Sequence, residues 1–237
     1  MIALPAVDLR DGLAVQWVGG RPATERIRMP DPVAVAMRWI SAGFTQLHVV
    51  DLDAALETGS NRDMIGRIVA ETGVPCQAGG GVRDEAAIQS MIDTGVRRVI
   101  VGTTAIENPA WLVSMSHTFP DRLTVAADVR AGIVVTRGWT RDTEFGVDEL
   151  LSTLDALPLA GVLVTDVGRE GSELGVDVPL FRRLTSLTAH PLHAAGGIAS
   201  LQDLSDLETA GVAGAVLGMS LYTGRLDAET TAREFSS

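Results

Sequence analysis

Four aspartates stand where short apolar runs of the sequence end, and they are the first candidates for chemistry. They are Asp8, Asp51, Asp128 and Asp166. A single aspartate in such a place is more often a helix cap or a loop-ordering acceptor, but the surroundings of these four repeat along the chain, which favours a shared site. Where two carboxyls differ in burial, one can donate a proton while the other accepts one. We therefore expect acid/base chemistry, with Asp8 and Asp128 facing each other.

Paired glycines with nearby hydroxyl side chains form a second group of candidates. Glycine lets backbone amides approach an oxyanion closely, so such turns can hold a phosphate. Tight turns between a strand and a helix also use paired glycines, but the duplication favours two phosphate sites and a ligand with a phosphate at each end. The first half of the chain contributes Gly80, Gly81, Gly102, Thr103 and Thr104, and the second half contributes Gly196, Gly197, Gly218 and Ser220.

The segment 134–141 places an arginine and a tryptophan on either side of a glycine, in what we expect to be a long loop. Arg137 could pair with a substrate carboxylate and Trp139 could stack on a ring. An exposed loop with a partly buried tryptophan is equally consistent with this pattern. His48 lies within an apolar run, where a hydrogen-bonded core histidine is more common than a catalytic one.

Eight short apolar runs alternate with longer stretches at helical spacing, and together they indicate the fold. The short runs are nearly continuous in hydrophobicity, as is typical of parallel strands covered on both faces. Eight such units in 237 residues predict an α/β protein, a (β/α)8 TIM barrel. An open doubly wound sheet would need a G-x-G-x-x-G turn after its first strand, and the sequence after Asp8 lacks one. The expected strands cover residues 2–8, 46–51, 75–79, 98–102, 123–128, 161–166, 191–195 and 214–218, and three of the expected helices cover residues 32–42, 84–94 and 201–210.

An internal repeat supports closure of this barrel. The glycines of the first half recur 116 positions later, and the segment around Asp8 recurs around Asp128, at an offset of 120. Two half-barrels, approximately residues 1–120 and 121–237, would then form a single domain with approximate two-fold symmetry. Because active sites of this fold lie at the carboxyl ends of the strands, both halves would present their aspartates at one mouth.

Composition and charge exclude several classes of protein. The net charge of −11 and the pI near 4.7 argue against general nucleic-acid binding, which needs clustered Lys and Arg. Cys76 is the single cysteine, so no intramolecular disulfide can form, and His190 and His193 lack the spacing of a zinc site. The N-terminus has no basic leader, and no apolar run is long enough to span a bilayer. We expect a soluble cytoplasmic protein with no metal, no membrane partner and no nucleic-acid partner.

Five segments together resemble the HisA family of histidine biosynthesis over nearly the whole chain. They are residues 4–8, 47–53, 79–83, 101–105 and 164–166. Residues 51–55, 59–61 and 137–139 are most similar to its actinobacterial branch, phosphoribosyl isomerase A or PriA, which serves both histidine and tryptophan synthesis.

The resemblance implies an Amadori rearrangement, in which an aminoaldose becomes an aminoketose without any cofactor. It implies that Asp8 is the general base at C2′ and that Asp166 or Asp128 is the general acid. It further implies a small phosphorylated substrate, and we expect a monomer. The residues implied to bind that substrate are the glycine and hydroxyl set above, together with His48, Arg83, Arg137, Trp139 and Thr165.

Two substrates occur in this family, and the chain departs from the pattern where they are distinguished. ProFAR carries two phosphates and an imidazole carboxamide, whereas phosphoribosylanthranilate carries one phosphate and a benzoate. Gln16 stands where ProFAR isomerases usually have arginine, residues 170–177 lack the usual D-G-T-x-x-G-P-N pattern, and Ala195 and Met219 replace a serine and often a lysine. We therefore expect phosphoribosylanthranilate isomerisation to be favoured over ProFAR isomerisation.

Two alternatives remain open at the level of sequence. The sister cyclase HisF uses the same half-barrel repeat, but its first strand normally reads C-L-D-V-x-x-G with a lysine nearby, whereas residues 5–8 and Gln16 favour the isomerase. The other alternative is a barrel that binds sugar phosphates without catalysis, and the intact set of aspartates argues against it.

Overall fold

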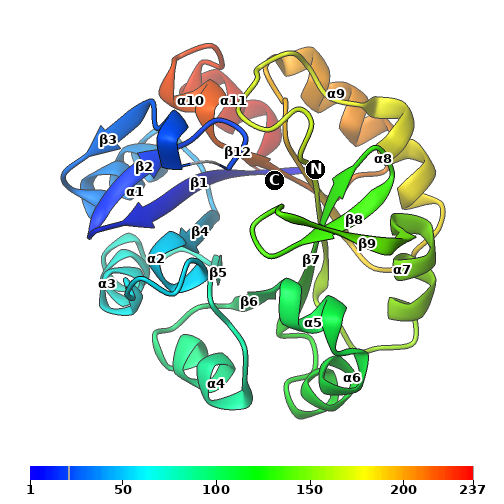
Figure 1. The fold of residues 1–237 in the computed structure, drawn as a ribbon. Coiled ribbons are helices and arrows are strands. Elements are labelled where there is room, and N and C mark those ends of the chain that lie inside the picture. Colours follow the sequence, from blue (N-terminus) through cyan, green and yellow to red (C-terminus); the bar gives the residue numbers. More distant parts are fainter. Residues whose placement is uncertain (21, 237) are drawn as a thin grey trace.

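The chain folds into a closed barrel of parallel strands with helices around it (Figure 1). The computed structural model describes residues 1–20 and 22–236. β1 pairs with both β12 and β4, and β10 pairs with both β11 and β7, so the ring of strands closes. The barrel strands are β1 (Ile2–Arg10), β4 (Leu47–Asp51), β5 (Cys76–Gly79), β6 (Arg98–Val101), β7 (Leu123–Arg130), β10 (Gly161–Asp166), β11 (Leu192–Ala195) and β12 (Gly214–Leu217). The predicted (β/α)8 barrel is confirmed, and each expected strand is present to within two residues at either end.

Helices cover the outer face of the barrel and bury their apolar sides against it. Trp39 on α1 and Phe181 on α8 are both fully buried. Most of these helices begin at a side chain that accepts a hydrogen bond from the first turn, such as Asp84 before α4 and Ser200 before α9. The long helices are α1 (Pro32–Ser41), α3 (Arg62–Thr72), α4 (Glu85–Asp93), α6 (Pro109–Thr118), α7 (Val147–Leu154), α8 (Val178–Thr185), α9 (Leu201–Thr209) and α11 (Ala228–Phe235). The short ones are α2 (Leu52–Ala55), α5 (Thr103–Glu107), α10 (Met219–Tyr222) and the 3-10 turn η1 (Pro22–Thr24).

Two antiparallel hairpins at the mouth of the barrel were not expected from the sequence. β1 and β7 continue past Asp8 and Asp128 because they pair with β2 (Leu13–Gln16) and β8 (Ile133–Thr136), which in turn pair with β3 (Ile27–Met29) and β9 (Arg141–Gly146). The prediction of a long loop over residues 134–141 is therefore wrong. The segment is a hairpin, and only its tip leaves the sheet, between β8 and β9.

The two hairpins share one geometry. Asp8 lies opposite Val15 and Asp128 lies opposite Val135, which is the same register at an offset of 120. Each first turn has two residues with positive φ, which are Asp11 with Gly12 and Ala131 with Gly132, as a two-residue hairpin turn requires. The repeat seen in the sequence therefore places the two aspartates in equivalent positions.

Across the two described stretches, no helix combines the length and the hydrophobicity needed to cross a membrane.

Candidate active site

Asp8 is a partly buried carboxyl near the end of β1, and its surroundings oppose ionisation. Burial and the negative charge of Glu170 raise its pKa from 3.8 to about 7. Gln16 acts against this shift, because its Nε2 donates a hydrogen bond of 2.9 Å to Oδ2 of Asp8. Such a carboxyl can change protonation state near neutral pH, as a general base must.

Asp128 occupies the equivalent place at the end of β7. Burial raises the pKa of this carboxyl, while hydrogen bonds from the Thr165 hydroxyl and the Trp139 side chain lower it. Thr165 lies beside Asp128 in the register of β10 with β7. The structure therefore joins three residues that the sequence suggested separately, Asp128, Thr165 and Trp139.

Glu170 is a candidate acid/base residue that the sequence analysis missed. It lies in the segment between β10 and α8, and its pKa is raised to about 7 by burial and by the negative charge of Asp128. Its charge also acts on Asp8, so Asp8, Asp128 and Glu170 form one electrostatic cluster. A lone glutamate in a loop carries no spacing signal. Its place in the segment after a barrel strand, where this fold carries its active site, was the available clue.

Asp166, the other predicted acid, is partly buried and also orders the segment that follows β10. Its Oδ1 accepts a hydrogen bond of 3.1 Å from the Gly168 amide, and its Oδ2 lies 3.4 Å from Nε of Arg169. Burial raises its pKa, whereas the Gly168 amide and the positive charge of Arg169 lower it. Through these contacts Asp166 holds in place the segment that carries Glu170.

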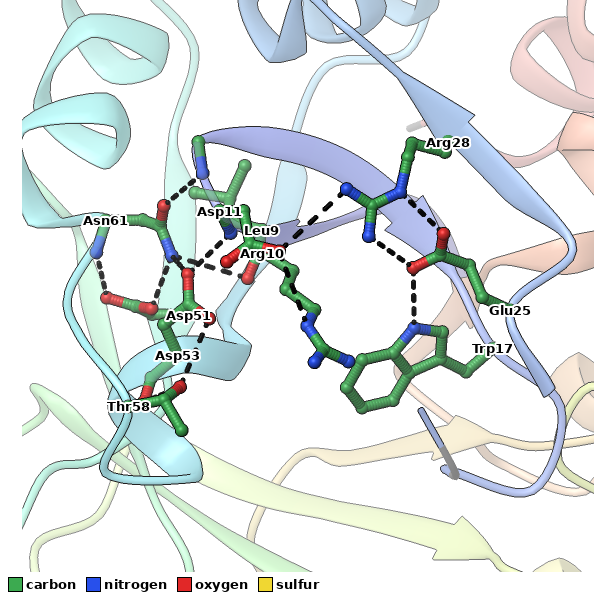
Figure 2. A network of polar contacts seen from close by, with 11 residues as sticks. Leu9, Arg10, Asp11, Trp17, Glu25, Arg28, Asp51, Asp53, Thr58 and Asn61 are labelled. Carbon is green, nitrogen blue, oxygen red and sulfur yellow. Dashed lines mark hydrogen bonds and ion pairs between the residues drawn. The ribbon is translucent and has the colours of Figure 1, made fainter. Parts of the chain in front are cut away.

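Asp51 has the helix-cap role that a single aspartate most often has. It is 1% exposed and accepts hydrogen bonds from the Ala54 amide at 3.0 Å, the Asn61 amide at 2.6 Å and Asn61 Nδ2 at 2.8 Å. Figure 2 shows Asn61 as the centre of this network, since it also donates to Asp53 and accepts from the Gly12 amide. Asn61, which Asp51 holds in place, therefore ties the first hairpin to the segment after β4.

The predicted phosphate sites lie on two segments with almost the same backbone. Gly102 precedes α5 with φ −114° and ψ −109°, and Gly218 precedes α10 with φ −105° and ψ −110°. Gly218 and Ser220 line a hollow together with Gly196, Gly197 and Glu170.

The paired glycines also meet a packing requirement. A side chain at Gly80 would clash with the Asp51 backbone, and one at Gly196 would clash with the Asp166 backbone. The tight-turn role therefore explains the first glycine of each pair without any ligand.

The tip of the second hairpin, between β8 and β9, reaches across the mouth. Arg137 forms a two-pronged ion pair with Glu107, with Nε 2.9 Å from Oε1 and Nη2 2.8 Å from Oε2. Its backbone amide donates to the Thr103 hydroxyl at 3.0 Å. Trp139 packs its ring directly against Gly20 of the first hairpin, which leaves no space for a side chain there. Trp139 therefore faces the mouth, whereas Arg137 is already paired.

Two other residues that were predicted to bind the substrate, His48 and Arg83, make contacts with other residues of the chain. His48 is 6% exposed, its Nδ1 lies 2.9 Å from Gln77 Nε2, and burial together with His193 lowers its pKa to about 3. Arg83 donates to the Ala54 carbonyl at 3.2 Å and pairs with Glu57 at 3.0 Å. Within residues 1–20 and 22–236, no group of three or more His, Cys, Asp or Glu side chains could hold a metal ion.

Comparisons with known proteins identify the relatives of this arrangement. Residues 2–227 match the family model described as histidine biosynthesis protein. A protein of Gemmatimonas aurantiaca named 1-(5-phosphoribosyl)-5-((5-phosphoribosylamino)methylideneamino) imidazole-4-carboxamide isomerase is 50% identical over 237 residues, which is 100% of each chain. Proteins of the same name from Myxococcus xanthus, 48% identical over 100% of each chain, and from Parafrankia sp., 42% identical over 93% of this chain and 90% of the relative, are also similar. These names do not support the preference for phosphoribosylanthranilate, and they do not assign the chain to the PriA branch.

Proposed function

This chain belongs to the histidine biosynthesis protein family and is a phosphoribosyl isomerase, and on that premise we propose that its substrate is ProFAR. ProFAR is the compound in the names of the relatives, and it carries a phosphoribosyl group at each end. The reaction would convert its aminoaldose end to an aminoketose. The observation that carries this proposal is the partly buried cluster of Asp8, Asp128 and Glu170, because one proton donor and one proton acceptor are all that the chemistry requires.

The surroundings of the carboxyls favour Asp8 as the base and Glu170 as the acid. Asp8 has a neutral donor, Gln16, that stabilises its ionised form. Burial and the Asp128 charge both keep the proton on Glu170. Glu170 would protonate the ring oxygen as the C1′–O bond breaks to give an iminium. Asp8 would then remove the C2′ proton to give an enaminol, and gain of a proton at C1′ with loss of the C2′ hydroxyl proton to the Glu170 carboxylate would complete the ketose.

Two features support a substrate with two phosphates over phosphoribosylanthranilate. Both glycine and hydroxyl segments are kept, with nearly identical backbones at Gly102 and Gly218, and their amides can bind phosphate without a basic side chain. A benzoate carboxylate would have to compete for Arg137 with Glu107, which already holds it through two hydrogen bonds.

Turnover of ProFAR and of phosphoribosylanthranilate by one purified preparation tests this proposal. We expect turnover of ProFAR that is lost in Asp8→Asn. Turnover of phosphoribosylanthranilate alone would overturn the assignment of substrate, and unchanged turnover in Asp8→Asn would overturn the assignment of the base. Catalysis without cofactor, a monomeric state and a cytoplasmic location stay predictions.

A further inference from the structure

Gln16 is a buried amide that lies between the predicted base and the second glycine segment. It is 2% exposed and ends β2, the strand that pairs with β1 next to Asp8. Its carbonyl oxygen accepts a backbone hydrogen bond of 2.9 Å from Arg26, and its backbone lies opposite Ile27 of β3. The main chain at Gln16 is therefore held by β3, and Val15 beside it is paired with Asp8, so the hairpin fixes where the Gln16 side chain starts.

The two ends of the Gln16 amide meet different neighbours. Nε2 donates to Oδ2 of Asp8 at 2.9 Å, while Oε1 faces Gly218. A Cβ built on Gly218 would stand 2.6 Å from Oε1, closer than side-chain atoms pack. A reversed amide would turn its oxygen toward the Asp8 carboxylate, which cannot donate. The observed orientation is therefore the one that supports an ionised Asp8.

Gly102 shows that the backbone alone does not create this restriction. It has nearly the same φ and ψ as Gly218 and the equivalent place in the other half of the barrel. A Cβ built on Gly102 would meet only the Ala126 side chain, at 3.9 Å. The lack of space at Gly218 therefore comes from Gln16 and not from the repeated turn.

We propose that Gln16 is a positioning residue for Asp8, and that Gly218 is required so that the Gln16 amide can hold the Asp8 carboxylate. The proposal deepens the proposed function and rests on Asp8 as its base. The titratable groups near Asp8 are Glu170, from the segment after β10, whose charge raises the pKa of Asp8, and Tyr222 on α10, whose own pKa the Asp8 charge raises and whose hydroxyl donates to the Ala6 carbonyl at 2.9 Å. Glu170 acts on Asp8 through its charge and Tyr222 donates its proton to the Ala6 carbonyl, whereas Gln16 donates a hydrogen bond to Asp8 itself.

The test is the pH dependence of kcat/KM in Gln16→Met, Gly218→Ala and the double variant. Loss of the donor should move the acidic limb upward by about one pH unit, which lowers kcat/KM about tenfold on the acidic side and little on the alkaline side. The double variant should show the same shift as either single variant, because both changes remove one hydrogen bond.

Two matched controls separate this effect from general damage. Gln202→Met removes an exposed Gln–Asp hydrogen bond of 2.9 Å on α9 and should leave the profile unchanged. Gly102→Ala adds the same methyl to the same backbone and should leave the midpoint of the acidic limb in place, whatever it does to substrate affinity. An unshifted limb in Gln16→Met or Gly218→Ala, or additive shifts in the double variant, would overturn the proposal. Retained turnover in Asp8→Asn would instead overturn the proposed function, so the two failures are distinguishable.

Discussion

Replacing Asp8 with asparagine should abolish turnover and at the same time stabilise the fold, by an amount that depends on pH. The pKa of this carboxyl is 3.8 in an unfolded chain and is raised to about 7 in the folded protein. Ionised Asp8 therefore lowers the free energy of unfolding. This loss begins as the pH rises above 3.8 and reaches its full size above about 7. At about 1.4 kcal/mol per pKa unit, removing the charge gains at most about 4 kcal/mol near pH 8 and about 1.5 kcal/mol near pH 5.

Urea unfolding of the wild type and of Asp8→Asn at these two pH values measures the difference. Gln16 can still donate to the asparagine oxygen, so the local packing is kept. Asp51→Asn is the matched control with the opposite expectation, because its carboxylate already accepts three N–H donors and an amide nitrogen would face one of them. A gain for Asp8→Asn that is equal at both pH values, or a loss near pH 8, would contradict the account of Asp8.

Three further changes test other parts of the site. Glu170→Gln should reduce turnover of ProFAR by about 10²–10⁴-fold in steady-state assays, the usual contribution of a general acid, because the proton held on Glu170 is then lost from the site. Glu107→Gln should release Arg137 and raise the ratio of kcat/KM for phosphoribosylanthranilate to that for ProFAR, whereas an unchanged ratio would mean that Arg137 binds neither substrate. Asn61→Ala should lower the free energy of unfolding by about 2–4 kcal/mol in urea titrations, because two buried carboxylates lose a donor.

The aspartates illustrate how far sequence spacing could go. Asp8 and Asp128 do share a mouth in equivalent hairpins, as the repeat predicted. Asp51 stands at a strand end like them, yet its carboxylate oxygens accept hydrogen bonds from the Ala54 and Asn61 amides. The reason is that α2 begins directly after this residue. Position at a strand end was visible in the sequence, but the partners of each carboxylate were not.

The departures from the family pattern show the same limit. In the sequence, Gln16 counted against the cyclase and as a missing arginine, and the second reading contributed to the preference for phosphoribosylanthranilate. In the folded protein Gln16 is the donor to Asp8, and Arg137, which could have paired with a substrate carboxylate, is bound by Glu107. Both contacts join residues on different elements, so no local sequence pattern indicates them.

The sequence by itself predicted the barrel, which the structure confirms, and the membership of the HisA family, which the comparisons confirm. Hydrophobic periodicity and glycine spacing can be read from short stretches of sequence. Eight consecutive strand–helix units can then close into a sheet in few ways. Tertiary structure alone decided which carboxyls share a charge environment, because burial and the approach of Glu170 to Asp8 depend on chain segments far apart in the sequence. A pKa is set by everything that surrounds a group in space, and the sequence specifies only its neighbours along the chain.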